Sequence, residues 1–377
     1  MADGIAPRPA GFTVLGSIHD FSRGAAREEQ LGDVLFHSAI RRSRAPPRAP
    51  GVTMQADMDH PGRREFLTSA FTAGVAAALS RPLPAAGESP VRRRMTIDLI
   101  CGNLGVKATQ REAIDLARRH GFESVFPDAG ELARLSDAEV QALLADLKAA
   151  GLVFGAAFLG VDFRKDEDTF GRGLAELPAY ARALRRAGVR RTGTWLPPSS
   201  DALTYLQYFK QTARRLREVA RVLADHEVRL GLEYVGPKTA WAARRYPFLH
   251  TLAETRELIA EIGATNVGLV LDSWHWFHAG DGAADVQTLR NEDVVAVDLN
   301  DAPADVPKDQ QKDNARELPL ATGVIDVAGF LKALAAMGYD GPVRAEPFNE
   351  AVRKMPAEEA VATTARAMKK AFALLEA

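Results

Sequence analysis

Short apolar runs alternate with longer stretches of helical period from residue 95 to the end of the chain. The runs are rich in β-branched residues, which is typical of buried parallel strands, whereas the stretches between them space apolar residues three and four apart. Strands are predicted at residues 95–100, 123–128, 153–158, 189–195, 228–234, 267–272, 294–299 and 343–348. Helices are predicted between them, and those at 110–121, 136–151 and 251–263 each end at a glycine, as helices commonly do.

Eight strand–helix units over residues 95–377 suit an α/β fold of the (β/α)8 TIM-barrel type, whose usual size is about 250 residues. The main alternative is a doubly wound open sheet. Its dinucleotide-binding form needs a G-x-G-x-x-G loop after the first strand, and the sequence CGNLGVKA at 101–108 does not fit that pattern. The pattern therefore favours a TIM barrel.

The first part of the chain has a different composition. Residues 40–51 are rich in arginine, proline and alanine and show no periodicity. Residues 1–57 are therefore predicted to be disordered, or to be an extension upstream of the true start. Met54 and Met58 are both plausible starts.

Residues 58–90 have the three parts of an export signal. Arg63 and Arg64 form a pair, a mildly apolar segment follows at 70–79, and small residues follow at 85–86. Because the paired arginines precede a weakly apolar middle, the segment resembles a twin-arginine signal. We expect the twin-arginine export machinery as a partner and a periplasmic or exported protein, or a cytoplasmic one if the signal is not used. The alternative is a short helix with a solvated arginine pair.

The composition of the whole chain excludes several classes of protein. The chain has 377 residues, with 48 Lys and Arg against 49 Asp and Glu, so its formal net charge is −1. Nucleic-acid binders are usually basic, and no nucleic-acid partner is expected here. Cys101 is the single cysteine, which excludes an intrachain disulfide and a multi-cysteine metal site. The sequence leaves homo-oligomer formation open.

Acidic residues lie at the ends of four late predicted strands. They are Glu233, Asp272, Asp298 and Glu346. In a TIM barrel the C-terminal ends of the strands carry the chemistry. Because strand side chains alternate, Asp272 shares a face with Val270 and points into the barrel mouth, while the neighbouring leucines face the helices. The four carboxylates are therefore predicted to converge.

Converging carboxylates raise one another's pKa unless a positive charge compensates them. One divalent metal ion is the simplest remedy, and oxygen donors favour Mn²⁺ or Mg²⁺. His275, three residues after Asp272, would widen the choice to Co²⁺, Fe²⁺ or Zn²⁺ if it were a ligand. The alternative is that basic residues balance the acids, and Arg344 and Lys238 are near in sequence.

Two loops have the character of a sugar-binding site. The loop at 236–250 carries Lys238, which could bind substrate hydroxyls, and Trp241, whose ring could stack on a sugar. Residues 301–323 form a long polar stretch without apolar period, which is uncommon unless functional. We interpret this stretch as a lid over the mouth that carries Arg316.

Several motifs together resemble the xylose isomerase-like TIM-barrel superfamily of sugar isomerases and epimerases, which includes inosose dehydratase and endonuclease IV. They are Glu233 in the fifth strand, the Asp-x-x-His of Asp272 and His275, the segment VDLNDAP at 297–303, Arg316 before 318–334, and GYDGPVRAEPF at 338–348. The resemblance covers nearly all of residues 95–377.

The resemblance implies roles for individual residues. The family binds one divalent metal through a Glu, an Asp, a His and a Glu from its fifth to eighth strands, and the two Glu residues form the acid/base pair. Glu233, Asp272 and Glu346 match that set, whereas Asp298 replaces the histidine. The resemblance also implies substrate contacts for the histidine of the Asp-x-x-His motif and for the arginine ahead of the T-G-x-I-D turn.

The resemblance implies a reaction on a small carbohydrate. One glutamate removes the proton next to a carbonyl to give an enediolate, and the other returns a proton. Return on the opposite face is epimerisation, return on the neighbouring carbon is isomerisation, and loss of a β-substituent is a lyase or dehydratase reaction on an inosose or 3-keto-glycoside. A nuclease is disfavoured because the early strand ends lack histidine. A non-catalytic sugar-binding barrel of the cell envelope remains the alternative from another class.

Overall fold

The computed structural model of the protein describes residues 93–376. The predicted disordered segment at 1–57 and the predicted export signal at 58–90 lie outside these residues and stay predictions. In the described part, no helix combines the length and the apolar character that crossing a bilayer requires.

All eight predicted strands are present in one parallel sheet, in which the strand predicted at 153–158 is divided into two. Its strands are β1 (Thr96–Leu99), β2 (Ser124–Val125), β3 (Val153–Phe154), β4 (Ala157–Phe158), β5 (Arg191–Trp195), β7 (Arg229–Glu233), β9 (Val267–Asp272), β10 (Val294–Leu299) and β11 (Pro342–Ala345). Two further short strands, β6 (Ser199–Ser200) and β8 (Tyr246–Pro247), pair antiparallel apart from the main sheet.

The strand order shows how the sheet closes. It runs β3-β2-β1-β11-β10-β9-β7-β5-β4, so β3 and β4 stand at opposite ends of the order. These two are halves of the single strand predicted at 153–158, interrupted after β3. A Cβ on Gly155 would lie 2.5 Å from Oδ1 of Asp98, so only a glycine lets the backbone pass there. The split strand pairs on both sides and closes the barrel, which confirms the predicted fold.

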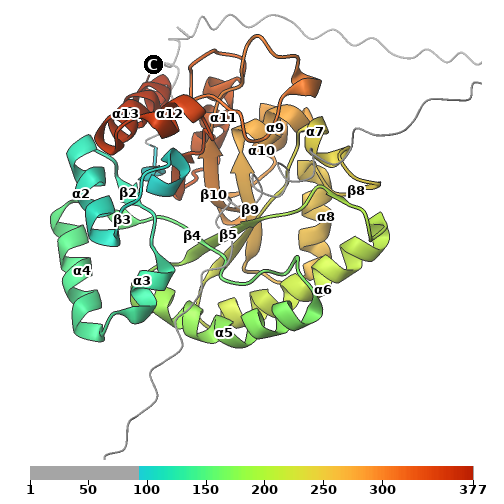
Figure 1. Cartoon of the computed structure of the whole chain (residues 1–377), viewed down its shortest axis with the longest axis horizontal. Coiled ribbons are helices and arrows are strands. Elements are labelled where there is room, and N and C mark those ends of the chain that lie inside the picture. Colours follow the sequence, from blue (N-terminus) through green and yellow to red (C-terminus); the bar gives the residue numbers. More distant parts are fainter. Residues whose placement is uncertain (1–92, 377) are drawn as a thin grey trace, which may run out of the picture. The chain divides into compact units, whose positions relative to one another are not determined.

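Helices surround the sheet (Figure 1). They are α2 (Gln110–His120), α3 (Ala129–Arg134), α4 (Asp137–Ala149), α5 (Glu167–Arg186), α6 (Tyr205–Ala224), α7 (Lys238–Trp241), α8 (Leu252–Ile262), α9 (Ser273–Ala279), α10 (Ala283–Gln287), α11 (Val327–Ala336), α12 (Glu350–Lys354) and α13 (Ala357–Phe372). The three helices quoted from the sequence are confirmed as α2, α4 and α8. Ser136 caps α4 in a capping box with Glu139, and Gly121 and Gly263 end α2 and α8 in the left-handed conformation.

Burial inside the sheet follows the predicted alternation. Leu269 and Leu271 of β9 belong to the large core shared with the helices. Val270, on the other face, packs with Ala156 and Ala296 in a small separate cluster. This cluster fills the barrel interior, and Asp272 stands on the same face of β9 as Val270.

Candidate active site

The four predicted acids meet at the C-terminal ends of the strands. Glu233 and Asp272 are the last residues of β7 and β9, Asp298 lies opposite Asp272 in β10, and Glu346 directly follows β11. All four are buried, with at most 7% of any of them exposed. Oxygens of Glu233, Asp298 and Glu346 lie within 4.8 Å of one another. The structure thus brings the predicted carboxylates together.

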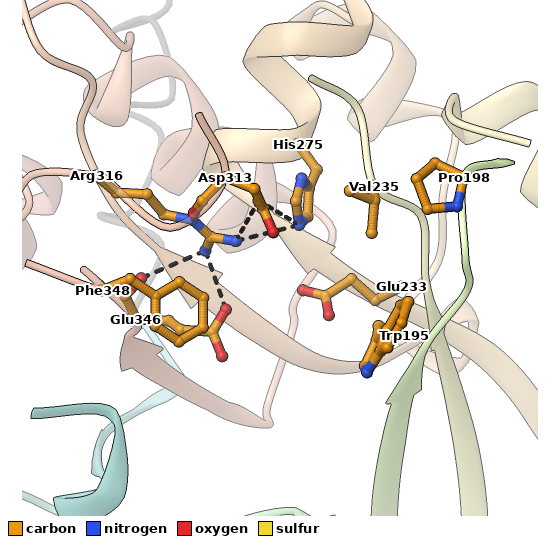
Figure 2. A pocket seen from close by; sticks show the side chains of 9 residues that line it. All are labelled: Trp195, Pro198, Glu233, Val235, His275, Asp313, Arg316, Glu346 and Phe348. Carbon is orange, nitrogen blue, oxygen red and sulfur yellow. Dashed lines mark hydrogen bonds and ion pairs between the residues drawn. The ribbon is translucent and has the colours of Figure 1, made fainter. Parts of the chain in front are cut away.

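Arg316 lies among these acids and pairs with Asp272 and Glu346; Figure 2 shows its bonds to Glu346 and Asp313. Its Nη1 donates to Oδ2 of Asp272 at 2.7 Å and to Oε2 of Glu346 at 3.0 Å, and its Nη2 donates to Oδ1 of Asp313 at 2.8 Å. Burial opposes the charge of Arg316, but the three carboxylates outweigh burial and raise its pKa above the usual value. Arg316 therefore carries a permanent positive charge at the centre of the site.

Arg344 neutralises the fourth acid. This arginine lies in β11, in register with Asp298 on one side and Asp98 on the other. Its Nε and Nη2 donate to the two oxygens of Asp298 at 2.6 and 2.9 Å, a two-bond geometry that fixes the carboxylate. Arg344 is thus the counter-ion that the sequence offered as an alternative, whereas exposed Lys238 pairs with Asp309 instead.

Glu233 differs from the other acids because it forms no ion pair within residues 93–376. Its Oε1 is buried and has no hydrogen-bond partner in the same part of the chain. Burial, and then the charges of Glu346, Asp298 and Asp272, raise its pKa well above the ordinary value. Burial and the charge of Asp298 also raise the pKa of Glu346. Burial and the neighbouring acids therefore raise the pKa of both Glu233 and Glu346.

The side chain of Asp272 is held by hydrogen bonds at the start of α9. Its Oδ1 accepts the N–H of Trp274 at 2.8 Å and so caps α9, and it also accepts Nδ2 of Asn300 at 3.0 Å. Oδ1 of Asn300 in turn accepts the backbone N–H of Glu346 at 2.9 Å. Asn300 thereby ties the ends of β9 and β11 together, a role that sequence analysis missed although it quoted the motif containing it.

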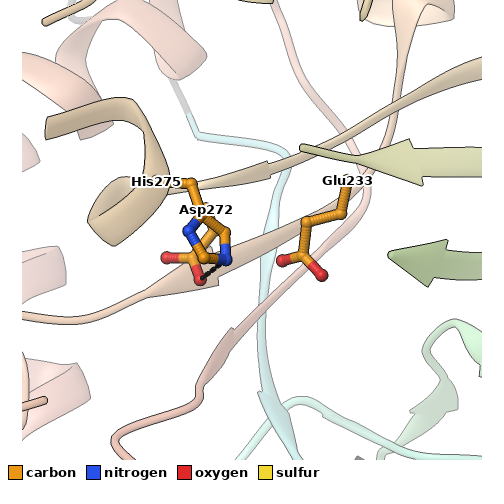
Figure 3. Close-up of side chains that lie close together, drawn as sticks. All are labelled: Glu233, Asp272 and His275. Atoms are coloured by element: carbon orange, nitrogen blue, oxygen red, sulfur yellow. Dashed lines mark ion pairs between the residues drawn. The ribbon is translucent and has the colours of Figure 1, made fainter. Parts of the chain in front are cut away.

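His275 faces Asp272 and Glu233 from the first turn of α9 (Figure 3). The N–H of Gly236 donates to its Nδ1 at 3.2 Å, and Nη2 of Arg316 lies 3.3 Å from its Nε2. Burial lowers its pKa to about 3, so the ring is neutral. Nε2 lies 3.7 Å from Oδ2 of Asp272. Ligand atoms of His275, Asp272 and Glu233 lie within 4.8 Å of one another, so a neutral His275 is placed to join the two acids in holding a metal ion.

Glu233 and Glu346 open onto a small pocket, whereas Asp272 and Asp298 do not line it. It has a volume of about 40 Å³ and includes side chains that sequence analysis had not singled out, namely Trp195, Pro198, Val235, Asp313 and Phe348. Trp195 could have been found, because it ends a predicted strand in register with Glu233. The loop residues could not, because no periodicity determines where a loop side chain points.

Two predicted substrate contacts lie away from this pocket. Lys238 is half exposed and reaches across to Asp309 of the loop at 301–323. Trp241 stacks on His250, with ring centroids 4.8 Å apart. Arg316, by contrast, lines the pocket and is carried there by that loop, as predicted.

The donor set fits a divalent cation. Five buried or nearly buried carboxylates face only two guanidinium groups here, so negative charge remains in excess. The unpartnered Oε1 of Glu233 points among hard oxygen donors, which suit such ions. The site is therefore able to hold a metal ion at Glu233.

The closed parallel barrel, with its acids at the C-terminal ends of the strands, places this protein among TIM-barrel proteins. A sequence model described as xylose isomerase-like TIM barrel matches residues 114–371, and the chain belongs to this family. This finding confirms the resemblance seen in the sequence.

Similar proteins include an isomerase and a dehydratase. An inosose isomerase of Bacillus velezensis is 24% identical over 199 residues, which is 53% of this chain and 68% of that protein. A 3-dehydroshikimate dehydratase of Pseudomonas aeruginosa is 31% identical over 144 residues, which is 37% of this chain and 21% of that protein. The chain spans about half or less of the length of the other curated relatives it matches.

The structure also resembles a solved one along its whole barrel. A xylose isomerase domain protein from Alicyclobacillus acidocaldarius is 34% identical and superimposes with a TM-score of 0.67. The match covers 75% of this chain and 100% of that protein.

Proposed function

We propose that this protein is a metal-dependent isomerase or epimerase that moves a proton next to the carbonyl of a keto-sugar or a related cyclic polyol. The observation that carries the proposal is the pair of buried glutamates with raised pKa, Glu233 and Glu346, on opposite sides of one pocket. Their pKa values rise because both side chains are buried and because each feels the charges of the other acids, so the protonation of one group affects that of its neighbours.

The carboxylates of Glu233, Asp272, Asp298 and Glu346 would hold one divalent metal ion. Their oxygen donors suit Mn²⁺ or Mg²⁺ best. When bound, the ion supplies Lewis acidity to a carbonyl oxygen of the substrate. Arg344 keeps Asp298 in place for this role through two hydrogen bonds.

The residues of the chain supply the proton transfers. With the ion bound, one ionised glutamate accepts the proton from the carbon beside the carbonyl. The carboxyl so formed returns a proton to the enediolate, or the other glutamate does so on the opposite face after taking a proton from solvent. The ring of His275 and the guanidinium of Arg316 line the same pocket and would orient the oxygens of the substrate. The small, largely buried pocket keeps bulk water away from the two acids.

A dehydratase reaction is the second candidate. It begins with the same proton removal and ends with loss of a β-hydroxyl in place of proton return. The similarity to the Pseudomonas 3-dehydroshikimate dehydratase, at 31% identity, supports it.

The test is exchange of carbon-bound hydrogen in D2O. The protein with added Mn²⁺ is incubated with a panel of ketoses and an inosose, and deuterium at carbon is measured by NMR. We expect exchange with at least one of them, and a loss of about a thousandfold in Glu233→Gln and Glu346→Gln. Glu317→Gln is the matched control, since Glu317 is a partly buried acid that bonds Asn349 outside the site. Unchanged exchange in both site variants would remove these glutamates from the reaction.

A further inference from the structure

A second, larger cavity lies beside the pocket of the acids. Its volume is about 430 Å³, and it is lined by residues that follow the C-terminal ends of β1, β2 and β4. The first pocket is lined from β5, β7, β9 and β11. The two cavities therefore occupy opposite halves of the same barrel mouth.

Phe348 stands between the two cavities and lines both. It follows Glu346 by two residues and holds a left-handed backbone conformation, with φ at 40°, which is strained for a phenylalanine. The guanidinium of Arg316 lies 4.7 Å from its ring centroid and that of Arg353 lies 5.3 Å from it. These two cation–π contacts hold the ring as a divider in spite of the strain.

The first pocket alone is too small for a sugar. One water needs roughly 10–15 Å³ by this measure, so about 40 Å³ holds roughly three waters, fewer than a six-membered sugar ring displaces. A substrate whose reacting carbon lies at Glu233 and Glu346 therefore extends out of this pocket, and the second cavity adjoins it at Phe348. The second cavity, at about 430 Å³, has room for the rest of the ring and for a further ring-sized group.

The wall of the second cavity determines what that further group is. Phe126 and Phe158 present rings whose centroids are 4.9 Å apart. The amide of Gln110 is used inside the protein, because it donates to the carbonyl of Phe126 at 3.0 Å and accepts the N–H of Asp128 at 2.6 Å. Asn103 likewise donates to the carbonyl of Ala345. With these groups engaged, the wall around the two phenylalanines offers mainly carbon surface. Lys107 and Arg353 also line the cavity and bring positive charge, and Nε of Arg353 has no hydrogen-bond partner within residues 93–376.

We propose that the second cavity is a subsite for an apolar ring attached to the sugar, so that the substrate is a keto-sugar joined by a glycosidic bond to an aromatic alcohol and not a free monosaccharide. This inference rests on the proposed function for the position of the sugar. Phe348 is the specificity-determining residue, because it separates the reacting unit from the attached ring.

The experiment measures binding, so it does not depend on turnover. Calorimetry compares phenyl β-D-glucopyranoside with methyl β-D-glucopyranoside on the full chain. We expect the phenyl glycoside to bind at least tenfold more tightly. In Gly102→Phe we expect that advantage to disappear, with the Kd for the methyl glycoside changed less than twofold. Gly102 lines the second cavity, and a Cβ there meets no atom within 4 Å, so the new ring fills space without a clash.

The matched control is Gly171→Phe in α5, at an exposed position where a Cβ also meets no atom within 4 Å. It should bind both glycosides as the unaltered protein does. Equal affinity for the two glycosides in the unaltered protein, or a Gly102→Phe variant that retains the phenyl preference, would overturn the subsite. A phenyl preference without any hydrogen exchange at carbon would instead refute the proposed reaction and leave the subsite standing.

Discussion

Arg316 and Arg344 divide the buried carboxylates of the barrel mouth between them. Arg316 pairs with Asp272 and Glu346, and Arg344 pairs with Asp298. Glu233 is left with an unpartnered oxygen in the described part of the chain. An isolated buried carboxylate is costly, so a site that keeps one needs a proton or a cation there.

The role proposed for Asp298 is testable at this scale. Asp298→Asn keeps an acceptor for Arg344 but removes one negative charge and one oxygen donor. We expect its Kd for Mn²⁺ to rise tenfold or more, measured by calorimetry. The control is Asp281→Asn, since Asp281 is a partly buried acid that bonds Tyr234 outside the site, and its Kd should change less than threefold. Unchanged Mn²⁺ binding in Asp298→Asn would leave Asp298 as a counter-ion of Arg344 alone.

At the scale of elements, the loop at 301–323 is anchored at its two ends. Oxygens of Asp301 accept four backbone N–H groups, those of Ala302, Thr322, Gly323 and Ile325, at 2.7–3.0 Å. Thr239 of α7 also donates to the carbonyl of Gln311. The loop is thereby held over the mouth, which places Arg316 among the acids.

Loosening this anchor should release the loop. Asp301→Asn replaces one accepting oxygen by an N–H2 group that faces N–H donors, and we expect a loss of stability of roughly 2–4 kcal/mol. Hydrogen exchange in residues 301–323 should rise more than in α13. The reverse order, or no change, would show that other contacts hold the loop.

The stability that Asp301 contributes depends on pH, and the direction follows from its pKa. Burial raises the pKa of Asp301, but its four backbone donors outweigh burial and lower it. The stability that it contributes is therefore present above the unfolded pKa of about 3.9 and is lost as the pH falls through the folded value.

At the scale of the whole molecule, barrel closure encloses a titratable group. Asp98 of β1 is buried, and its two oxygens have no hydrogen-bond partner among residues 93–376. The closing strand passes directly over it at Gly155. Burial, more than any other cause, raises the pKa of Asp98 to about 6.

This burial predicts how global stability depends on pH. Because the folded pKa of Asp98 is raised, its contribution is present below the unfolded pKa and is lost as the pH rises through about 6. Between pH 5 and pH 8 the unaltered protein should lose about 1 kcal/mol more than Asp98→Asn, measured by urea unfolding. Parallel curves for the two proteins would mean that Asp98 keeps an ordinary pKa.

The barrel could be predicted from the sequence because the spacing of apolar residues and the acidic residues at strand ends are both local features of the chain. The sequence placed Glu233, Asp272 and Glu346 at strand ends, and the structure brings them together. It could not foresee that the strand at 153–158 splits, because the cause is the side chain of Asp98 in another strand. The position of Phe348 was equally unpredictable, since it depends on a strained loop conformation and on contacts across the mouth.

The most direct test of the account is Mn²⁺ titration of metal-free protein at pH 7, repeated in buffers of different ionisation enthalpy. We predict one ion per chain and release of about one proton on binding, because the raised pKa values of Glu233 and Glu346 keep a proton in the site that the ion displaces. Glu233→Gln should weaken binding and abolish the release. Absence of saturable binding, or binding with no proton released, would contradict the account.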